Sequence, residues 1–333
     1  MSQPYFVDIR HLKKYFPIKT GLFNRVVGHV KAVDDISLGI YKGETFGLVG
    51  ESGCGKSTLG RVVLHLQKAT DGEVYFDGKN VQAMNSQQLR RLRQDMQIIF
   101  QDPFGSLNPR FHVQDIIGEP LRVHRRMSAK EMDKKVVELM ELVGLDASRR
   151  NRYPHEFSGG QRQRIGIARA IALNPQFIVA DEAVSALDVS VQSQVLNLLM
   201  KLQKELGLTF LFIAHGLNVV RHISDRVGVM YLGKLVEVAR TEELFANPLH
   251  PYTAALLSAI PRPNPHRKKE RIVLQGDVPS PANPPSGCRF HPRCAYAQEQ
   301  CRKIDPEMQT VSSGRQVACH FPLEYSEMKV LIQ

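Results

Sequence analysis

The residues with the clearest chemistry form a glycine-rich loop near the start of the chain. Residues 50–58 read Gly-Glu-Ser-Gly-Cys-Gly-Lys-Ser-Thr, a complete G-x-x-x-x-G-K-[ST] phosphate loop that directly follows the apolar run 45–49. A strand that enters such a loop and a helix that leaves it aim backbone N–H groups and a helix N-terminus at one point, which suits a triphosphate. The residues expected to bind the nucleotide here are Gly50, Ser52, Gly53, Cys54, Gly55, Lys56, Ser57 and Thr58.

Two side chains of this loop have specific expected partners. Lys56 is expected to reach the β and γ phosphates, and Ser57 to ligate the Mg²⁺ ion that bridges them. A glycine-rich turn with a chance lysine is the alternative, and the complete motif after a strand makes it much less favoured. The loop predicts a nucleotide but not what the nucleotide does.

Four further polar residues each follow an apolar run that is expected to form a buried strand. Gln101 is placed for the attacking water or for Mg²⁺, Asp181 can hold Mg²⁺ through water, and Glu182 can polarise the nucleophilic water. His215 is suitably placed to contact the γ-phosphate. Taken singly, each is more simply read as a solvated strand end or a structural residue. Their order and spacing after the phosphate loop favour a nucleotide hydrolase.

A second phosphate-type motif lies at 157–161, Phe-Ser-Gly-Gly-Gln, where a glycine pair opens a predicted helix. Its residues Ser158, Gly159, Gly160 and Gln161 resemble the signature motif of ATP-binding-cassette (ABC) ATPases. With 185–188, Ser-Ala-Leu-Asp, as the D-loop that ends in Asp188, the whole set is similar to that family over about residues 5–260. The resemblance implies that two such domains pair head to tail, so that this motif faces the γ-phosphate held by the partner and ATP is buried between them.

The resemblance also shows departures. Tyr15 resembles the aromatic residue that stacks on adenine, although the insertion 17–30 lengthens the usual gap to the loop. Ala183 stands where proline usually follows the glutamate, and Gly216 where aspartate usually follows the histidine. Neither departure removes a catalytic group, but Gly216 is expected to add backbone freedom beside the histidine.

The elements that must position these residues predict an α/β fold. Predicted strands alternate with helices of a length that implies a parallel sheet. The resemblance implies a P-loop NTPase of the ABC ATPase type, a RecA-like core with an antiparallel β subdomain and a helical subdomain, followed by a C-terminal cysteine-bearing extension. The expected elements are an edge strand at 72–78, a strand at 96–100, a helix from the capping box at Ser128 to Gly144, a helix at 161–173, a strand at 177–180, a helix at 192–206, a strand at 208–214 and a hairpin around 233–234.

The expected domains divide at a proline-rich run, 261–265, because proline at this density defeats both helix and sheet. Residues 1–260 are expected to form the nucleotide-binding domain, with its helical subdomain at about 103–160. Residues 261–333 are expected to form the extension.

Composition and charge narrow the function classes. The chain has 333 residues, is 43% apolar and carries a formal net charge of +11. It shows neither a secretory h-region nor an apolar run long enough to span a bilayer, so we expect neither a secreted nor an integral membrane protein. The surplus charge suits nucleic acid or an anionic membrane face, and scattered solvated charge explains it equally well. The basic clusters are Arg90, Arg91 and Arg93; Arg122, Arg125 and Arg126; and Arg262, Arg267, Lys268, Lys269 and Arg271.

Four of the five cysteines crowd into the tail, as Cys288, Cys294, Cys301 and Cys319. Disulfides are not expected in a chain without an export signal. Four thiolates suit either a structural Zn²⁺ ion or a [4Fe–4S] cluster, and their wide spacing matches neither short zinc knuckles nor the ferredoxin run. The spacing alone leaves zinc and iron open.

The tail carries a resemblance of its own. Residues 249–253, Leu-His-Pro-Tyr-Thr, with Leu256, Leu257 and the run 287–294, Gly-Cys-Arg-Phe-His-Pro-Arg-Cys, resemble the C-terminal extension of oligopeptide and dipeptide importer ATPases of the F type. Because members of that family carry an iron–sulfur cluster on such cysteines, the resemblance favours [4Fe–4S] over zinc.

This second resemblance implies a set of partners and a location. They are a related D-type ABC ATPase subunit or a second copy, two transmembrane permeases and an extracytoplasmic peptide-binding protein, with the chain peripheral at the cytoplasmic face of the cell membrane and no nucleic acid bound. The competing class is a soluble ABC-type ATPase that acts on nucleic acid or ribosomes, but the coiled-coil insertion or second cassette usual in that class is absent. A purely structural metal-binding protein explains only the tail. The sequence does not identify the transported substrate: nickel, glutathione and short sugars are alternatives to peptides.

Overall fold

The computed structural model describes residues 4–323 apart from 22–23, 126, 261–271 and 313. Contacts divide the chain into two compact units. The first unit consists mainly of residues 83–213, and the second consists of 5–40, 45–82 and the chain from 214 onward. The proline-rich run 261–265, where the sequence predicts a domain boundary, lies outside the described residues.

The first unit contains three parallel strands, β6 (Met96–Ile99), β7 (Phe177–Asp181) and β8 (Thr209–Ile213), with β7 in the middle. Strands β7 and β8 are buried along their whole length, which is typical of a parallel sheet covered on both faces. The predicted strands and their parallel order are thus confirmed to within one or two residues at each end.

The helices of the first unit begin at residues that their sequence marks. Asn85, Ser128 and Ser158 each cap a helix with a complete capping box, which satisfies backbone N–H groups at the helix start. The sequence predicted the second and third of these helices but not the first. The helical elements are α2 (Ser86–Asp95), α3 (Val113–His124), α4 (Ala129–Leu142), α5 (Gly159–Ile171) and α6 (Val189–Leu206), with short 3₁₀ turns η1 (Ala147–Arg149) and η2 (Pro154–Glu156).

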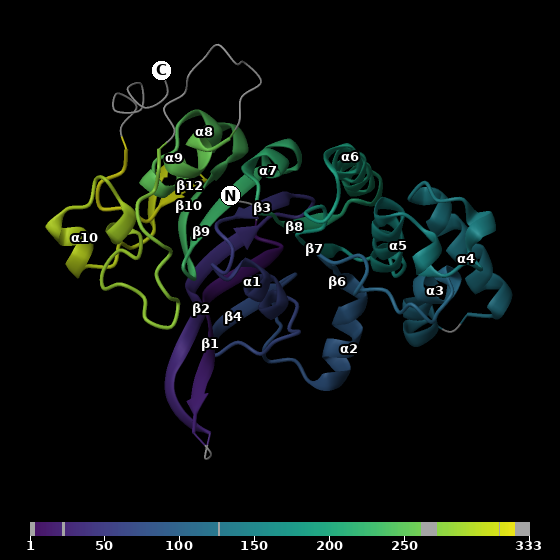
Figure 1. Ribbon diagram of the computed structural model, residues 1–333. Coiled ribbons are helices and arrows are strands. Elements are labelled where there is room, and N and C mark those ends of the chain that lie inside the picture. The colour runs from purple at the N-terminus through teal and green to yellow at the C-terminus, as the bar shows by residue number, and fades with distance from the viewer. Residues whose placement is uncertain (1–3, 22–23, 126, 261–271, 313, 324–333) are drawn as a thin grey trace, which may run out of the picture. The chain divides into compact units, whose positions relative to one another are not determined.

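The second unit contains an antiparallel sheet in the order β2-β1-β4-β5. The insertion at 17–30 extends β1 (Val7–Thr20) and β2 (Arg25–Ile40), which run side by side as one long hairpin (Figure 1). The strand predicted at 72–78 is present as β4 (Asp71–Phe76), but its predicted edge position is wrong. β4 pairs on both sides, because the chain turns at Gly78 and adds β5 (Lys79–Asn80) as the edge.

The second unit also contains five strands in the order β11-β12-β10-β9-β3. The hairpin predicted around 233–234 is present, between β9 and β10. The two tail strands were not predicted, because the proline-rich tail shows little apolar periodicity. The elements are β3 (Thr45–Val49), β9 (Arg226–Tyr231), β10 (Lys234–Arg240), β11 (Gln309–Ser312) and β12 (Arg315–Val317), with α1 (Lys56–Val63), α7 (Leu217–Ile223), α8 (Thr241–Ala246), α9 (Pro251–Ser258), η3 (His291–Arg293) and α10 (Glu299–Lys303).

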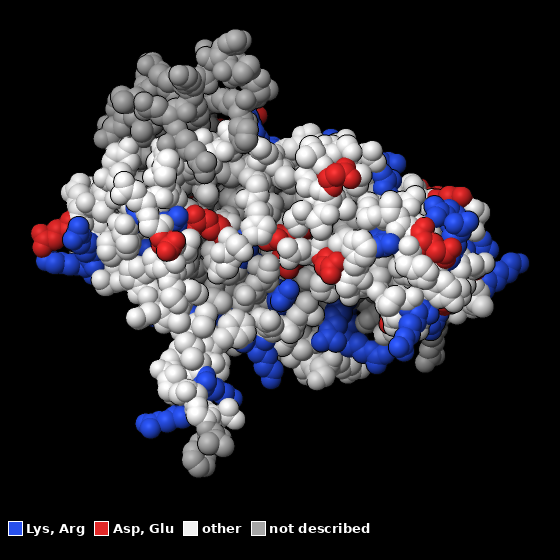
Figure 2. All heavy atoms as spheres, viewed as in Figure 1, with Lys and Arg blue, Asp and Glu red and all other residues white. Residues whose placement is uncertain are grey.

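Part of the basic surface is gathered and part is scattered. On the face drawn in Figure 2, lysine and arginine lie at several places, the largest group of them below and to the right of the centre. Burial and the charges of Arg90, Arg93 and Arg125 lower the pKa of His124, so these three arginines of two predicted clusters lie near one another. Arg122 pairs with Asp115 at 3.1 Å, while Arg126 and the predicted cluster at 262–271 lie outside the described residues. Within the described residues, no helix has both the length and the apolar character needed to cross a membrane.

Candidate functional site

The phosphate loop of the second unit has a backbone that only glycine permits at two positions. A Cβ atom at Gly55 would lie 1.8 Å from the carbonyl oxygen of Ala32, and one at Gly50 would lie 2.1 Å from that of Met230. Gly55 also has a φ of 105° and stands at the N-cap of α1. The motif glycines are therefore required by close packing of the loop against β2 and β9.

Lys56 is buried within the phosphate loop, with 3% of its surface exposed. Its Nζ donates to the carbonyl oxygen of Gly50 at 2.7 Å and to that of Glu51 at 3.1 Å. The first turn of α1 carries no acidic residue, and the N-cap offers no side-chain acceptor. The helix N-terminus thus presents N–H groups and partial positive charge to an anion.

The other predicted loop residues fall into two kinds. Ser52 and Gly53 are exposed, while Ser57 and Thr58 are half-buried in the first turn of α1. Cys54 is buried, and burial raises the pKa of its thiol, which keeps it protonated and unreactive. Cys54 is therefore a packing residue of the loop.

The first unit brings two predicted catalytic residues together. Gln101 Nε2 donates to Glu182 Oε2 at 2.6 Å. Glu182 is 5% exposed and has a φ of 49°, a conformation that is strained for a residue with a side chain and is found at functional sites. Its N–H donates to the carbonyl oxygen of Ile213, and its own carbonyl accepts from Ser185 Oγ at 3.0 Å. The turn after β7 is thus held from both sides, with Asp181 buried at the strand end.

The signature motif forms the start of α5. Ser158 is exposed, and its Oγ accepts from the N–H of Gln161 at 3.3 Å, while Gln161 Oε1 accepts from the N–H of Ser158 at 3.0 Å. A Cβ atom at Gly160 would lie 2.4 Å from Val191 Cγ1, so glycine allows the motif to pack against the start of α6.

The D-loop of the first unit is ordered in the same way. Asp188 caps α6 by accepting from the N–H of Val191 at 2.9 Å and from Ser190 Oγ at 2.8 Å. The hydrogen bond from the Val191 N–H lowers the pKa of Asp188. Because Val191 also meets Gly160, the signature motif and the D-loop form one packed surface.

His215 lies in the second unit, exposed, just before α7. The following Gly216 has a φ of −95° and a ψ of 124°, which any residue can adopt. The backbone freedom expected at Gly216 is therefore not used in this conformation.

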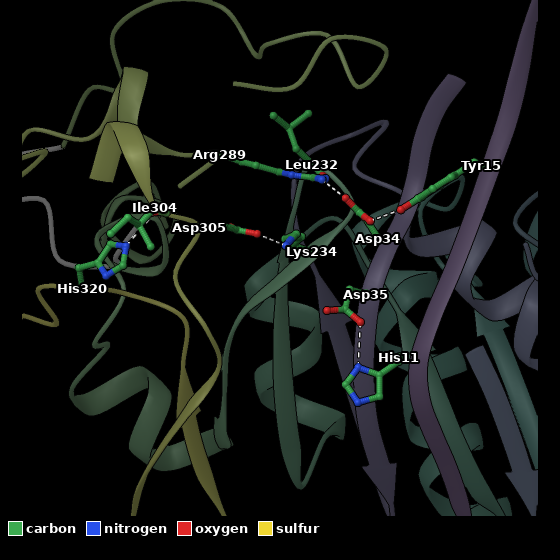
Figure 3. Close-up of polar contacts among 10 residues, drawn as sticks. All are labelled: His11, Tyr15, Asp34, Asp35, Leu232, Lys234, Arg289, Ile304, Asp305 and His320. Carbon is green, nitrogen blue, oxygen red and sulfur yellow. Dashed lines mark hydrogen bonds and ion pairs between the residues drawn. The ribbon is translucent and has the colours of Figure 1, made fainter. Parts of the chain in front are cut away.

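Tyr15 is held by a carboxylate that the sequence did not single out. Its hydroxyl donates to Asp34, and burial raises the pKa of Tyr15. The Lys31 ammonium lies 5.7 Å from the centre of the Tyr15 ring. Asp34 also accepts from Arg289 of the tail, so the aromatic side chain is tied to the C-terminal extension (Figure 3).

The four tail cysteines line one small cavity of about 20 Å³, and residues 287–304 with 319–321 are called the cysteine lobe here. Burial raises the pKa of Cys288 to about 11 and that of Cys319 to about 12, so these two free thiols are neutral at pH 7. Within the described residues, no three or more His, Cys, Asp or Glu side chains are arranged to hold a metal ion.

A buried carboxylate explains part of the motif at 249–253. Glu237, 0% exposed, accepts from the N–H groups of Leu249 and His250, each at 2.9 Å, and from Arg315 Nη2 of the tail strand β12. Burial raises the pKa of Glu237 and lowers that of His250 to about 3, so the imidazole is neutral. His250 Nδ1 accepts from the N–H of Tyr252 at 3.0 Å and caps α9.

Sequence reasoning missed Glu51, Asp34, Arg289 and Arg293 as site residues. Arg293 Nη1 and Nη2 donate to the two carboxylate oxygens of Glu51 at 2.8 and 3.2 Å, across 242 residues of chain. The only available signal was that both arginines lie in the run 287–294, which resembles a known extension. No local pattern identifies their partners.

Two family descriptions match the chain. That of the ABC transporter covers residues 33–185, and that of the oligopeptide/dipeptide transporter C-terminal region covers residues 236–301. The chain is 56% identical to the oligopeptide transport ATP-binding protein AppF of Bacillus subtilis, over 96% of this chain and 98% of AppF. It is 53% identical to the dipeptide transport ATP-binding protein DppF of Haemophilus influenzae, over 92% of this chain and 94% of DppF.

Solved structures give the same picture for the cassette. The dimeric post-hydrolysis structure of the ATP-binding cassette MJ0796, bound to ADP and Pi, matches with a TM-score of 0.63 and 31% identity, over 71% of this chain and 98% of that chain. CbiO1 from Clostridium perfringens, part of the ABC transporter complex cbiONQ, matches with a TM-score of 0.63 and 27% identity, over 73% of this chain and 92% of that one.

Proposed function

The chain belongs to the ABC transporter ATPases, in the group of oligopeptide and dipeptide transport ATP-binding proteins, and from this membership we propose that it energises the import of di- and oligopeptides. As a member of the family it is an ATP-binding and ATP-hydrolysing subunit. The observation that carries the peptide assignment is the similarity of the tail, because the C-terminal region of peptide transporters matches residues 236–301 and AppF matches almost end to end.

The nucleotide roles follow from the phosphate loop. Lys56 would exchange its loop carbonyl partners for the β and γ phosphates, since its ammonium already lies inside the loop. The amides from Gly53 to Thr58 would hold the phosphate oxygens, and Tyr15 would stack on adenine. Mg²⁺ would neutralise the charge that develops on the phosphates, with Ser57, Gln101 and Asp181 as its oxygen ligands, directly or through water.

The hydrolytic roles fall to the residues after the strands. Glu182 would accept a proton from the attacking water, and the Gln101 amide, 2.6 Å from its carboxylate, would fix the direction of that carboxylate. His215 would contact the γ-phosphate. The residues Ser158, Gly159, Gly160, Gln161 and Asp188 would act on the nucleotide of a partner cassette. This agrees with the exposure of Ser158 and Asp188 and with the capping hydrogen bonds that order the starts of α5 and α6.

The partners are proposed from the same membership. They are a related D-type ATPase subunit or a second copy of this chain, two transmembrane permeases and an extracytoplasmic binding protein. The chain would then lie peripherally at the cytoplasmic face of the cell membrane, where its surplus of +11 meets anionic lipid. We retain the division into a nucleotide-binding domain, 1–260 with its helical subdomain at about 103–160, and an extension, 261–333.

We further propose that Cys288, Cys294, Cys301 and Cys319 hold a [4Fe–4S] cluster. The donor set supports this, because all four thiols line one cavity. Zinc is the alternative, and it needs four sulfurs about 2.3 Å from one point, whereas a cubane binds each thiolate through a different iron. In the described residues no three or more His, Cys, Asp or Glu side chains are arranged to hold a metal ion, so the geometry favours neither group and the preference for iron comes from the family resemblance.

Iron analysis of protein purified without oxygen tests the cluster. We expect brown protein with broad absorption at about 400 nm and about four irons per chain. Cys294→Ser should bleach the colour. The matched control is Cys54→Ser, which removes a buried cysteine outside the lobe and should keep the colour. Colourless protein with one tightly bound zinc ion would show that the four cysteines hold zinc and not a cluster. Four thiols that alkylate freely in native protein would exclude both zinc and the cluster.

Transport by the reconstituted complex tests the peptide assignment. With the two permeases and the binding protein proposed as its partners in proteoliposomes, ATP should drive uptake of a labelled dipeptide or pentapeptide. The Glu182→Gln complex should not support uptake. ATP-driven uptake of nickel, glutathione or a short sugar in place of any peptide would contradict the assignment and leave the ATPase assignment intact.

A further inference from the structure

Two arginines of the cysteine lobe reach the nucleotide-binding part of the second unit. Arg289 directly follows Cys288, and Arg293 directly precedes Cys294. The side chains of both are nearly buried, 9% and 8% exposed, and both contact carboxylates far away along the chain. Buried arginine is normally held by such pairing, so the two contacts fix the lobe on this unit.

Arg293 acts on the phosphate loop itself. It donates from both Nη atoms to the Glu51 carboxylate, at 2.8 and 3.2 Å, a bidentate geometry that is among the strongest and most directional of ion pairs. Glu51 lies between Gly50 and Ser52 in the loop, and its carbonyl oxygen accepts from Lys56 Nζ at 3.1 Å. One residue therefore connects the lobe arginine with the lysine that serves the phosphates.

The same residue is held a second time from the tail side. The N–H of Glu51 donates to the hydroxyl oxygen of Tyr252 at 2.9 Å. Tyr252 is fully buried and belongs to the motif 249–253. It packs on Tyr231, with the two ring centres 4.8 Å apart. Both motifs that resemble peptide-importer tails thus converge on Glu51, which no ATPase motif requires to be glutamate.

Arg289 provides a parallel connection. It donates to Asp34, which holds the Tyr15 hydroxyl, and to the carbonyl oxygen of Leu232 (Figure 3). The next residue, Gly233, donates its N–H to the carbonyl oxygen of Cys54 in the phosphate loop at 2.9 Å. Directly after the lobe's residue 304, Asp305 pairs with Lys234 of β10.

We propose that Arg293 is a positioning residue for nucleotide binding, which orients the phosphate loop through Glu51 and couples the cysteine lobe to the nucleotide. The geometry requires the coupling to run both ways. A lobe that holds Glu51 in place favours the binding-competent loop, and by linkage a bound nucleotide makes the lobe more rigid. The state of the four cysteines is thereby linked to the affinity for ATP, without any contact between cysteine and nucleotide.

Nucleotide titration of the full-length chain tests the proposal. We expect Arg293→Gln and Glu51→Gln each to weaken binding of a fluorescent ATP analogue by about tenfold, within the usual range of coupling between sites. The double variant should be no weaker than either single one, because both remove the same interaction. Inorganic tripolyphosphate, which lacks a base, should lose the same factor, since the effect acts at the phosphate end.

The control keeps the lobe and changes a charge that the proposal does not use. Lys303→Gln removes the exposed partner of Glu299 in α10 and should leave both affinities unchanged. Arg293→Lys, which keeps the charge but not the bidentate geometry, should recover part of the loss. Affinity of Arg293→Gln within twofold of the parent, or losses that multiply in the double variant, would overturn the proposal.

Limited proteolysis tests the reverse direction and separates positioning from mere support of the fold. In the parent chain, tripolyphosphate should slow cleavage within the cysteine lobe several-fold, and in a folded Glu51→Gln variant it should not, even at saturation. Glu51→Gln changes no residue of the lobe, and its cleavage rate without tripolyphosphate, compared with that of the parent, is the control for the fold of the lobe. An unchanged slowing in Glu51→Gln would show that any coupling bypasses Glu51 and would refute the proposal.

Discussion

The helices α1 and α5 both begin at a glycine-containing motif suited to phosphate, but their N-termini are built differently. At α1 the N-cap is Gly55, no side chain caps the helix, and the lysine of the motif is buried. At α5 the N-cap is Ser158, a complete capping box satisfies the helix start, and the serine is exposed. The first terminus lacks a side-chain acceptor at its N-cap, and the second already has one.

This difference between α1 and α5 indicates which helix start is suited to bind the phosphates of the chain's own nucleotide. At α1 the amides and the lysine form one enclosed loop, which suits tight binding by a single chain. At α5 the serine and glutamine are ordered by each other, and the serine is exposed. Such a surface suits contact with a nucleotide presented by another cassette. The comparison therefore predicts that binding depends on α1 and turnover on α5.

The largest effect on turnover is expected from a substitution that changes neither helix start. Glu182→Gln should lower the steady-state rate of phosphate release by about 10²–10⁴-fold, because the amide keeps the shape but does not accept the proton. The affinity for ATP should stay near that of the parent. A rate of phosphate release within threefold of the parent would show that Glu182 is not a catalytic residue and that the two helix starts account for the activity.

Lys56→Ala should have the next largest effect, on binding. It removes the buried ammonium of α1, and losing one partner of a buried charge pair costs about 2 kcal/mol or more, so the Kd for ATP should rise by roughly 30-fold or more. Equilibrium titration with a fluorescent ATP analogue measures this. Arg61→Ala is the matched control, since it removes a cation from the last turn of α1 and should leave the Kd unchanged.

Ser158→Ala should have a smaller effect, on turnover. It should reduce phosphate release by about tenfold, as expected for the loss of one hydrogen bond to a charged group, without changing the Kd for ATP. It should also lower the free energy of unfolding by about 1 kcal/mol through the lost cap. Ser128→Ala removes the same capping box from α4, with the same 3.3 Å bond, and gives the control. Equal loss of turnover in both variants would mean that the serine acts only through stability.

The sequence predicts the local structure around one class of candidate site residue, and it gives no sign of the long-range partners of another class. The phosphate loop, the signature motif and the pair Asp181 and Glu182 are encoded by neighbours within a few residues, so their helices and strands follow from local pattern. Partners of Arg289 and Arg293 lie 255 and 242 residues away, and the two arginines carry no periodicity that points to them. Long-range pairs of this kind depend on the packed fold.

The fold shows the same division. The strands β7 and β8 are buried throughout and each has four apolar residues out of five, and both were predicted. By contrast, β5 has two residues and β12 has three, too short for any alternation to show. The tail strand β12 forms because it pairs with β10 and because Arg315 reaches the buried Glu237. Neither interaction has a local signal in the proline-rich tail.

The most direct test of the difference between α1 and α5 is the ATPase rate per chain across a wide dilution series. Because α5 is proposed to act on a partner's nucleotide, the rate per chain should be low at dilution and rise with concentration, or with the D-type partner, while the Kd for ATP in the Glu182→Gln variant stays constant. Ser158→Ala should flatten the rise. A rate per chain that stays high and flat over the series would contradict the account, because each chain would then complete its own site.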